Sequence, residues 1–130
     1  MLVDTDVFIW YLRGYEKAAT FLEDCQPVML SVVTYMELVQ GMRNKQELQV
    51  LRQTIQHWRW RVLPIDEIIS NRAAIYVEEH FLSHSLRLAD ALIAATAVEQ
   101  GLTLATANSK HYRMIKELVI KRFDPSPMLE

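Results

Sequence analysis

Short apolar runs alternate along the chain with longer segments in which apolar residues recur at helical spacing. The runs predict strands over residues 1–4, 27–30, 61–65 and 102–105, with residues 119–123 as a candidate fifth. The longer segments predict helices over residues 6–13, 31–42, 45–58, 68–82 and 86–100. This alternation predicts an α/β fold, in which a mainly parallel sheet of four to five strands lies between helices as a three-layer α/β/α sandwich.

Polar residues follow the expected strands at their C-terminal ends. Asp4, Ser31 and Asp66 follow the first three strands, and Thr106 with Asn108 follows the fourth. The carboxyl ends of parallel strands meet at one edge of a sheet, and open α/β sheets bind their ligands there. We therefore expect the chemistry of this protein at that edge.

Composition narrows the class of protein. Apolar residues make up 51% of the chain and charged residues 23%, which excludes disorder, and 130 residues suit a single domain over residues 1–130. No apolar run approaches the ~20 residues of a membrane span. Asp4 and Asp6 interrupt the apolar N-terminus, so we expect no membrane anchor, no secretory signal and a cytoplasmic location. The single Cys25 forms no internal disulfide and fits a reducing compartment.

Asp4 and Asp6 lie at the junction between the first strand and the helix after it. Thr5 or Asp6 is suited to cap that helix, because a side-chain oxygen there satisfies a free backbone amide. One cap does not account for both Asp4 and Asp6. This surplus of acid favours a binding role at the sheet edge.

Asp90 is the only charge within residues 88–98, an almost wholly apolar segment that predicts a buried helix. A buried carboxylate without a partner is costly or becomes protonated, so its charge requires compensation. Two interpretations stay open. Asp90 caps a helix that starts one residue later or pairs with Arg87, or it belongs to a binding site; Ser83 and Ser85 offer earlier caps and so favour the site.

Glu37 also has two interpretations. The segment Thr34-Tyr-Met-Glu37 matches a capping box, in which the acid reaches back to a backbone amide. If Ser31 caps the helix instead, Glu37 points from the second turn toward the edge that carries Asp4. The sequence supports both arrangements equally.

Three acids from distant parts of the chain, Asp4, Glu37 and Asp90, suit a hard divalent cation such as Mg²⁺ or Mn²⁺. Mg²⁺ binds few protein carboxylates and keeps several waters, which leaves positions for a phosphate and an attacking water. This chemistry indicates phosphodiester hydrolysis. Acid clusters in α/β folds also serve phosphoryl-transfer receivers and phosphatases, so the pattern alone is moderately specific.

Four stretches carry a resemblance to a known family: LVDTDVFIWYL at residues 2–12, SVVTYMELVQG at 31–41, LADALIAA at 88–95 and LATANSKHY at 104–112. In order and spacing they resemble the four motifs of PIN-domain ribonucleases, and they are most similar to VapC toxins of prokaryotic toxin–antitoxin pairs. The resemblance covers nearly the whole chain.

This resemblance implies a PIN-like fold and an endoribonuclease that cleaves RNA with Mg²⁺ or Mn²⁺. It implies a homodimer, held inactive by a cognate VapB-like antitoxin encoded beside it. By the same resemblance Asp4, Glu37 and Asp90 are the metal-binding, catalytic acids. The supporting polar positions are Thr5, Asp6, Ser31, Thr106 and Asn108.

One departure concerns the last motif. Many PIN domains have a fourth acid there, whereas this chain has His111 where that acid would stand. Asn108 orients a water or ligand through its amide but brings no charge, which leaves open whether one metal or two bind. Asp6 stands where the family often has Asn, and our hypothesis is that it supplies the missing charge.

Basic and aromatic residues offer further candidates. The net charge of −2 gives no global basic field, so RNA would need a local patch. Phosphate contacts in such a patch would position RNA beside the acids, whereas a solvated face explains the same charges. The most basic stretch holds Lys110, His111, Arg113, Lys116, Lys121 and Arg122 against Glu117.

Two other motifs have ordinary explanations beside the functional ones. His80 and His84 are one helical turn apart, as in zinc sites, but no general-base Glu stands between them, so an exposed helix end explains them better. Residues 57–61, HWRWR, interleave rings with cations and suit stacking on bases. Packing of the tryptophans in the core or in a dimer explains this segment better.

Two rival functions stay open. A phosphatase of the haloacid dehalogenase type would use Asp4 as its nucleophile, because Asp4-Thr-Asp6 resembles the Asp-x-Asp motif of that class. The chain lacks the later motifs of that class and is short for it. The second rival is an inert PIN-like module that binds RNA or protein, made plausible by the missing fourth acid.

Overall fold

Five parallel strands form one sheet at the centre of the computed structural model, which describes residues 1–83 and 86–127. The order across the sheet is β3-β2-β1-β4-β5. This arrangement confirms the predicted α/β fold and its parallel sheet, including the candidate fifth strand. The strands are β1 (Leu2–Val3), β2 (Met29–Ser31), β3 (Arg61–Leu63), β4 (Leu104–Thr106) and β5 (Ile120–Arg122).

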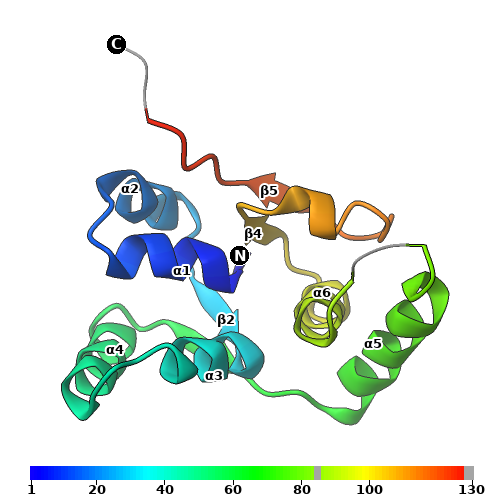
Figure 1. Cartoon of the computed structure of the whole chain (residues 1–130), viewed down its shortest axis with the longest axis horizontal. Helices are drawn as coiled ribbons and strands as arrows, with labels where there is room; N and C mark the ends of the chain where they lie inside the picture. Colours follow the sequence, from blue (N-terminus) through cyan, green and yellow to red (C-terminus); the bar gives the residue numbers. More distant parts are fainter. Residues whose placement is uncertain (84–85, 128–130) are drawn as a thin grey trace.

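Helices connect the strands and cover the sheet on both sides. In Figure 1, α5 and α6 lie to the right of the strands, and α1, α2 and α4 lie to the left. The sequence pattern predicted five of the α-helices, while α2 and the short 3₁₀ helix η1 were not expected. The helices are α1 (Thr5–Leu12), α2 (Glu16–Asp24), α3 (Val32–Gln40), α4 (Lys45–His57), α5 (Glu67–His80), α6 (Leu88–Gln100) and η1 (Ser109–His111).

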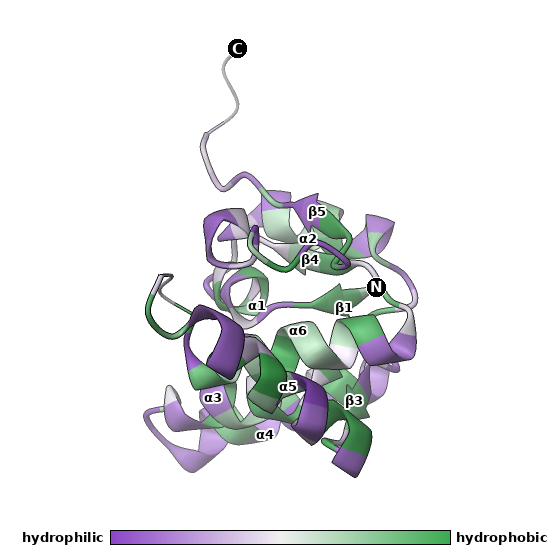
Figure 2. Cartoon of the chain, turned by 90° about the vertical axis from the view of Figure 1, so that its right-hand side faces the viewer, coloured by the Kyte–Doolittle hydropathy of each residue, from purple (hydrophilic) through white to green (hydrophobic). Residues whose placement is uncertain are grey.

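The two residues of β1 divide the core into two halves. Successive side chains of a strand point to opposite faces, so Leu2 packs under α5 and α6 whereas Val3 packs under α1, α2 and α4. Both residues are fully buried, and the ribbon of β1 is green, hence apolar, in Figure 2. Helix α3 contributes Val33 to the first half and Leu38 to the second. The result is the expected three-layer sandwich.

The strand order reverses between β1 and β4. The chain proceeds from β1 to β2 and β3 on one side, and then crosses to β4 and β5 on the other. Such a reversal opens a crevice at the carboxyl ends of the two strands, where α/β proteins bind ligands. Asp4 stands at the end of β1 and Thr106 at the end of β4, so both lie at this crevice.

Ser31 and Asp66, which the sequence placed at the edge of the sheet, serve as helix caps. The Ser31 hydroxyl accepts a hydrogen bond from the Val33 amide at 3.1 Å and caps α3. The Asp66 carboxylate accepts one from the Ile69 amide at 2.8 Å and caps α5. Within residues 1–83 and 86–127, no helix has both the length and the apolar character needed to cross a membrane.

Candidate functional site

Asp4 is a buried carboxylate at the junction of β1 and α1, with a relative exposure of 6%. One oxygen, Oδ1, accepts a hydrogen bond from the Thr5 amide at 2.8 Å as the cap of α1. The other, Oδ2, accepts from the Thr106 hydroxyl at 2.8 Å and from the Tyr112 hydroxyl at 2.9 Å. Three donors therefore hold Asp4 in one orientation, and two of them come from more than 100 residues along the chain.

Asp6 lies one residue inside α1 and faces the end of β4. Its Oδ2 accepts hydrogen bonds from the Asn108 amide group at 2.9 Å and from the Ala107 backbone amide at 3.1 Å, with the Thr106 hydroxyl at 3.4 Å. Its Oδ1 is buried and, among the described residues, has no hydrogen-bond partner. An unsatisfied buried carboxylate oxygen is costly, so this atom is suited to a ligand.

The two carboxylates share a crowded, acidic environment. Burial, together with the charge of Asp6, raises the pKa of Asp4 to about 7, although hydrogen bonds from Thr106 and Tyr112 oppose the rise. Burial also raises the pKa of Asp6, opposed by the donors at the end of β4. The part of the chain that the structure describes provides neither carboxylate with a cationic ion-pair partner. A bound cation would favour the ionised form of both carboxylates and so lower both pKa values.

Asp90 lies in the first turn of α6, with its side chain 15% exposed. Its Oδ2 accepts a long hydrogen bond from the Arg87 backbone amide at 3.4 Å, because α6 begins at Leu88 with Arg87 as its N-cap. Asp90 itself is therefore not the N-cap, although it has a local capping contact. Its Oδ1 lies 3.3 Å from the Tyr112 hydroxyl, which joins it to Asp4.

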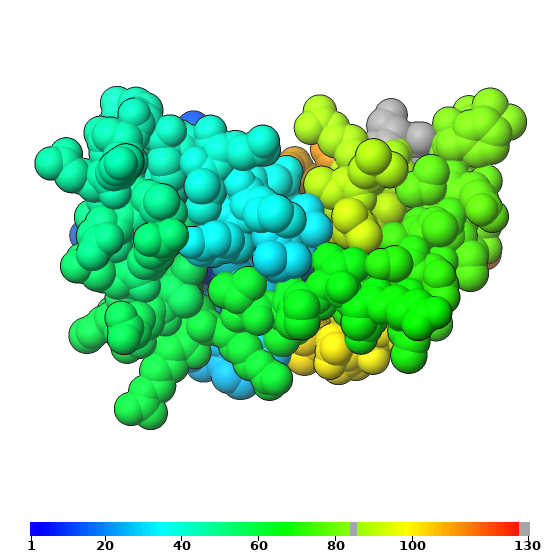
Figure 3. Space-filling view, turned by 90° about the horizontal axis from the view of Figure 1, so that it is seen from below, coloured from blue at the N-terminus to red at the C-terminus, as the bar shows by residue number. Residues whose placement is uncertain are grey.

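Glu37 points toward the same edge from α3. Because Ser31 caps α3, Thr34 lies inside the helix, and the capping-box interpretation is wrong. The Thr5 hydroxyl instead donates a hydrogen bond to Glu37 Oε1 at 2.7 Å and lies 3.0 Å from the Thr34 hydroxyl. Glu37 is thus connected to the residue that follows Asp4. In Figure 3, α3 in cyan and the start of α6 in yellow-green lie side by side on one face of the molecule.

Tyr112 belongs to the candidate site although sequence analysis did not select it. Its side chain is fully buried, and its hydroxyl contacts both Asp4 and Asp90. Burial and the nearby carboxylates raise the pKa of the phenol, so it stays protonated and remains a donor. Its position at the end of the last motif, LATANSKHY, was the only signal in the sequence.

The acids approach one another in pairs. Tyr112 joins Asp4 to Asp90, and Thr5 joins the neighbourhood of Asp4 to Glu37. Within residues 1–83 and 86–127, no three acidic, histidine or cysteine side chains are close enough to form one metal-binding group. The donor chemistry still fits a hard divalent cation, because carboxylate oxygens dominate and the described residues give Asp6 Oδ1 no hydrogen bond. Mg²⁺ commonly takes one or two carboxylates and completes its shell with water.

The expected RNA-contacting residues follow β4 in the chain. Lys110, Arg113 and Lys116 are exposed after the end of β4. His111, which stands where the family has an acid, places Nδ1 3.8 Å from Asp90 Oδ2. His111 therefore places an imidazole, and not a fourth carboxylate, beside Asp90.

The other sequence candidates lie elsewhere. Trp60 packs in the core against Phe8, with ring centroids 5.0 Å apart, which confirms core packing for that ring. Trp58 is exposed just before β3, hence at the opposite end of the strands from the acids. Of the proposed zinc pair, His80 lies 3.7 Å from Glu79, and His84 is outside the described residues.

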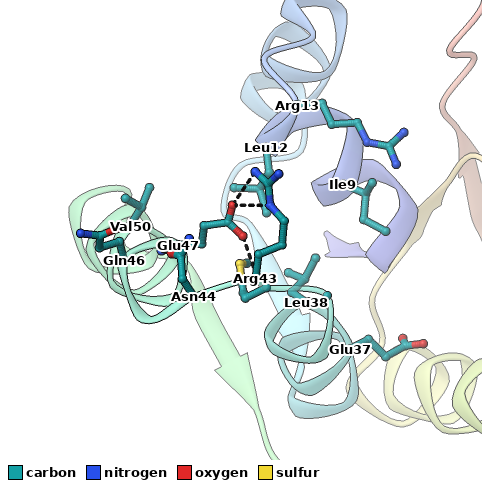
Figure 4. Close-up of a pocket in the computed structure, with 12 residues that line it drawn as sticks. Ile9, Leu12, Arg13, Glu37, Leu38, Arg43, Asn44, Gln46, Glu47 and Val50 are labelled. Atoms are coloured by element: carbon teal, nitrogen blue, oxygen red, sulfur yellow. Dashed lines mark hydrogen bonds and ion pairs between the residues drawn. The ribbon is translucent and has the colours of Figure 1, made fainter.

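An apolar groove lies beside the acidic edge, between α1, α3 and α4 (Figure 4). Its volume is about 720 Å³. Arg43 and Glu47 form an ion pair of 2.9 Å on one wall, and Glu37 lies at the margin and points toward α6. Its apolar lining includes Ile9, Leu12, Leu38, Met42 and Val50.

Comparison with known proteins shows a family and relatives that match most of the chain. The sequence matches the family model of the PIN domain over residues 1–117. It is 39% identical over 122 residues to Ribonuclease VapC10 of Mycobacterium tuberculosis, covering 91% of this chain and 90% of the relative. It is 31% identical over 125 residues to Ribonuclease VapC1 of Methanocaldococcus jannaschii, covering 95% of this chain and 87% of that one.

Solved structures show the same architecture. The chain superposes on a toxin–antitoxin complex from Klebsiella pneumoniae with a TM-score of 0.78, at 27% identity and with 98% of each chain covered. The shared fold extends over both halves of the core, so the similarity is not confined to the acidic edge.

Proposed function

Because the chain belongs to the PIN-domain family, we propose that it is a metal-dependent endoribonuclease and the toxin of a toxin–antitoxin pair. One observation carries the proposal: Asp4 and Asp6, buried at the reversal point of the sheet, have no cationic partner among the described residues. Asp4 and Asp90 contact one phenol, and among the described residues Asp6 Oδ1 is buried without a hydrogen-bond partner. Such an arrangement is costly unless a cation binds there.

The residues fit Mg²⁺ or Mn²⁺, held by Asp4 and Asp90, with Glu37 binding the ion or its water. A cation of this kind supplies a water of lowered pKa and neutralises charge on the phosphoryl oxygens. Thr106 and Tyr112 orient the Asp4 carboxylate, and Thr5 orients Glu37. Asn108 fixes Asp6 beside them.

RNA reaches the site along an exposed edge. Figure 3 shows a narrow opening between α3 and the start of α6, in which the orange segment that follows β4 is visible. Lys110, His111, Arg113 and Lys116 belong to this segment, and we assign them to phosphate contacts. Phosphate contacts of this kind position a nucleic acid without reading its sequence.

We propose that the groove beside Glu37 is the binding site of a VapB-like antitoxin. A polypeptide segment on this apolar floor would reach the margin where Glu37 lies, and so would cover the acids. Aspartate substitution of Leu12 and Val50 should then weaken the complex with the antitoxin encoded beside this protein. Val119, exposed but outside the groove, provides the matched control for an added charge.

We also propose a homodimer and a cytoplasmic location, both of which stay predictions. Size-exclusion chromatography with light scattering tests the dimer. The inert-module alternative predicts retained RNA binding without cleavage. The phosphatase alternative predicts a phosphoryl group trapped on Asp4, and the membership in the PIN-domain family disfavours it.

The test is cleavage of a mixed structured RNA pool by the purified protein in Mg²⁺ or Mn²⁺. Parallel reactions contain a chelator, or the Asp4→Asn or Asp90→Asn protein. Discrete cuts that vanish in all three controls support the proposal. Cuts that persist in both variants identify a contaminating nuclease, and the absence of cuts together with the absence of Mn²⁺ binding by the wild-type protein would overturn the proposal.

A further inference from the structure

Tyr112 brings an unusual hydrogen-bond arrangement to the acidic edge. Its hydroxyl oxygen lies 2.9 Å from Asp4 Oδ2 and 3.3 Å from Asp90 Oδ1. A phenol donates one hydrogen, so it donates to one carboxylate at a time. The shorter distance assigns the hydrogen bond to Asp4, and the second carboxylate lies within contact distance of the same oxygen.

The ring holds this hydroxyl in place. Tyr112 is 0% exposed and packs in the half of the core beneath α6, together with Ala91, the neighbour of Asp90. Its backbone is fixed on both sides, because its amide donates to the Ser109 carbonyl at 3.1 Å and its carbonyl accepts from the Ile115 amide at 3.0 Å. The hydroxyl is therefore a rigid point between the end of β1 and the first turn of α6.

Asp4 and Asp90 belong to different elements, so a fixed group that contacts both is needed to set their separation. Asp4 follows a strand of one segment and Asp90 belongs to a helix formed some 86 residues later, so no local backbone geometry sets their separation. Hydrogen bonds to metal-binding carboxylates orient these ligands, and loss of such a bond commonly weakens metal binding about 10-fold to 100-fold. The phenol donates to Asp4 and contacts Asp90 through the same oxygen, so this oxygen sets the position of one acid relative to the other.

We propose that the Tyr112 hydroxyl is the positioning group that holds Asp4 and Asp90 at the separation at which they bind a divalent cation. This inference rests on the proposed nuclease function, because it assigns a role within the same site. Tyr112 acts through the two carboxylates and is not itself a ligand or a reacting group.

The experiment measures Mn²⁺ binding to the RNA-free protein by isothermal titration calorimetry at constant pH. In Tyr112→Phe the ring still fills the core and only the oxygen is lost. We expect its Kd for Mn²⁺ to rise at least about 10-fold. Circular dichroism and a melting curve, with the titration run well below the melting temperature, verify that the variant is folded.

Tyr76→Phe is the matched control. Tyr76 is also a buried tyrosine, 3% exposed, and its hydroxyl donates to a carboxylate, Glu117 Oε1, at 2.6 Å. It lies on α5, and within the described part of the chain its hydroxyl contacts Glu117 and none of the acids of the candidate site. Its loss should change the melting temperature and leave the Kd for Mn²⁺ unchanged.

A kinetic split separates positioning from structural support. In Tyr112→Phe the Mg²⁺ concentration for half-maximal RNA cleavage should rise by the same factor as the Kd, and the rate at saturating Mg²⁺ should stay close to that of the wild type. A Kd for Mn²⁺ equal in Tyr112→Phe and the wild type overturns the inference and leaves the proposed function standing. A wild-type protein that binds no Mn²⁺ overturns both.

Discussion

Two buried tyrosines in this protein each place a hydroxyl on a carboxylate, in opposite electrostatic settings. Tyr112 contacts Asp4 and Asp90 at the sheet edge. Tyr76 contacts Glu117, and there Arg72 lies 3.5 Å from the same glutamate and also forms an ion pair with Glu99. In the first cluster, Asp4 has no basic partner among the described residues, and Asp90 has only the imidazole of His111, 3.8 Å away. In the second, which we call the balanced cluster (Tyr76, Glu117, Arg72 and Glu99), a guanidinium contacts the carboxylates.

The pKa values follow this difference. At the edge, burial and the charge of Asp6 raise the pKa of Asp4. In the balanced cluster, the hydrogen bond from Tyr76 and the charge of Arg72 lower the pKa of Glu117, while burial and that glutamate raise the pKa of Tyr76 to about 12. A tyrosine beside a carboxylate is therefore compensated by a positive charge in one place, whereas in the other the carboxylate is buried beside a second acid.

Substitutions in the two clusters should differ most in their effect on the rate of RNA cleavage. We expect Asp90→Asn to reduce RNA cleavage at least about 100-fold, since loss of a ligand should exceed the loss of an outer hydrogen bond. Glu117→Gln should leave the rate within twofold of the wild type. Initial rates on one defined RNA substrate measure both, and equal losses in the two variants would remove the functional distinction.

The second effect is the dependence of stability on pH without metal. The folded-state pKa of Asp4 is raised to about 7, so the fold favours the protonated acid. The stability that this group contributes is present below its ordinary pKa near 4 and is lost as pH rises through about 7. We expect a loss on the order of 2 kcal/mol between pH 5 and pH 8, measured by urea unfolding in chelator.

Asp4→Asn is the control for this pH dependence. Removal of the ionisable group should flatten the slope and raise the stability at pH 8. The lowered pKa of Glu117 acts in the opposite direction but mainly below pH 5, because its stabilisation is complete above the ordinary pKa of 4.5 and is lost as the pH falls through the lowered value. A wild-type protein that gains stability between pH 5 and pH 8 would contradict the assignment of Asp4 as a strained acid.

The third effect concerns the balanced cluster alone. Arg72→Met should reduce the free energy of unfolding by about 1 kcal/mol, since the ion pairs of Arg72 are partly exposed and screened by water. Thermal or urea unfolding measures this loss. The Kd for Mn²⁺ should not change. A larger Kd would mean that the balanced cluster influences the acidic edge through residues 112–117.

The smallest effect is expected at Asp6. Asp6→Asn should weaken Mn²⁺ binding a few-fold, because it removes the charge beside the unpartnered Oδ1 while the amide can still accept from the end of β4. Calorimetry at constant pH measures the change. Unchanged affinity would contradict the hypothesis that Asp6 replaces the missing fourth acid.

Periodicity predicted the parallel sheet and five of the helices, because most of these segments bury one regular apolar face. It missed α2, whose start has no capping side chain: Tyr15 occupies the N-cap and makes no side-chain cap bond. Only Ala18 and Leu22 of α2 are buried, which is too short a pattern to recognise. The formation of α2 therefore depends on the tertiary packing of these two residues and not on a local sequence signal.

The acids of the candidate site could be selected from the sequence, but their arrangement in space could not. Surplus charge on apolar segments marked Asp4 and Asp90, but Glu37 fitted a capping box equally well until the position of the helix start, at Ser31, decided it. Tyr112 carried no signal of its own, since a tyrosine beside apolar residues predicts core packing. Its role depends on a contact across 108 residues, which no local pattern contains.

The first strand of the chain lies in the middle of the sheet, and this affects how the protein is made. Two side chains that donate hydrogen bonds to Asp4, those of Thr106 and Tyr112, lie 102 and 108 residues further along the chain. Ribosomes add about 5–20 residues per second, so roughly 5–20 s separate the translation of Asp4 from that of Tyr112. During this interval the growing chain cannot hold Asp4 in its final setting. We therefore expect the messenger RNA nearest to the enzyme during its synthesis to be spared by it.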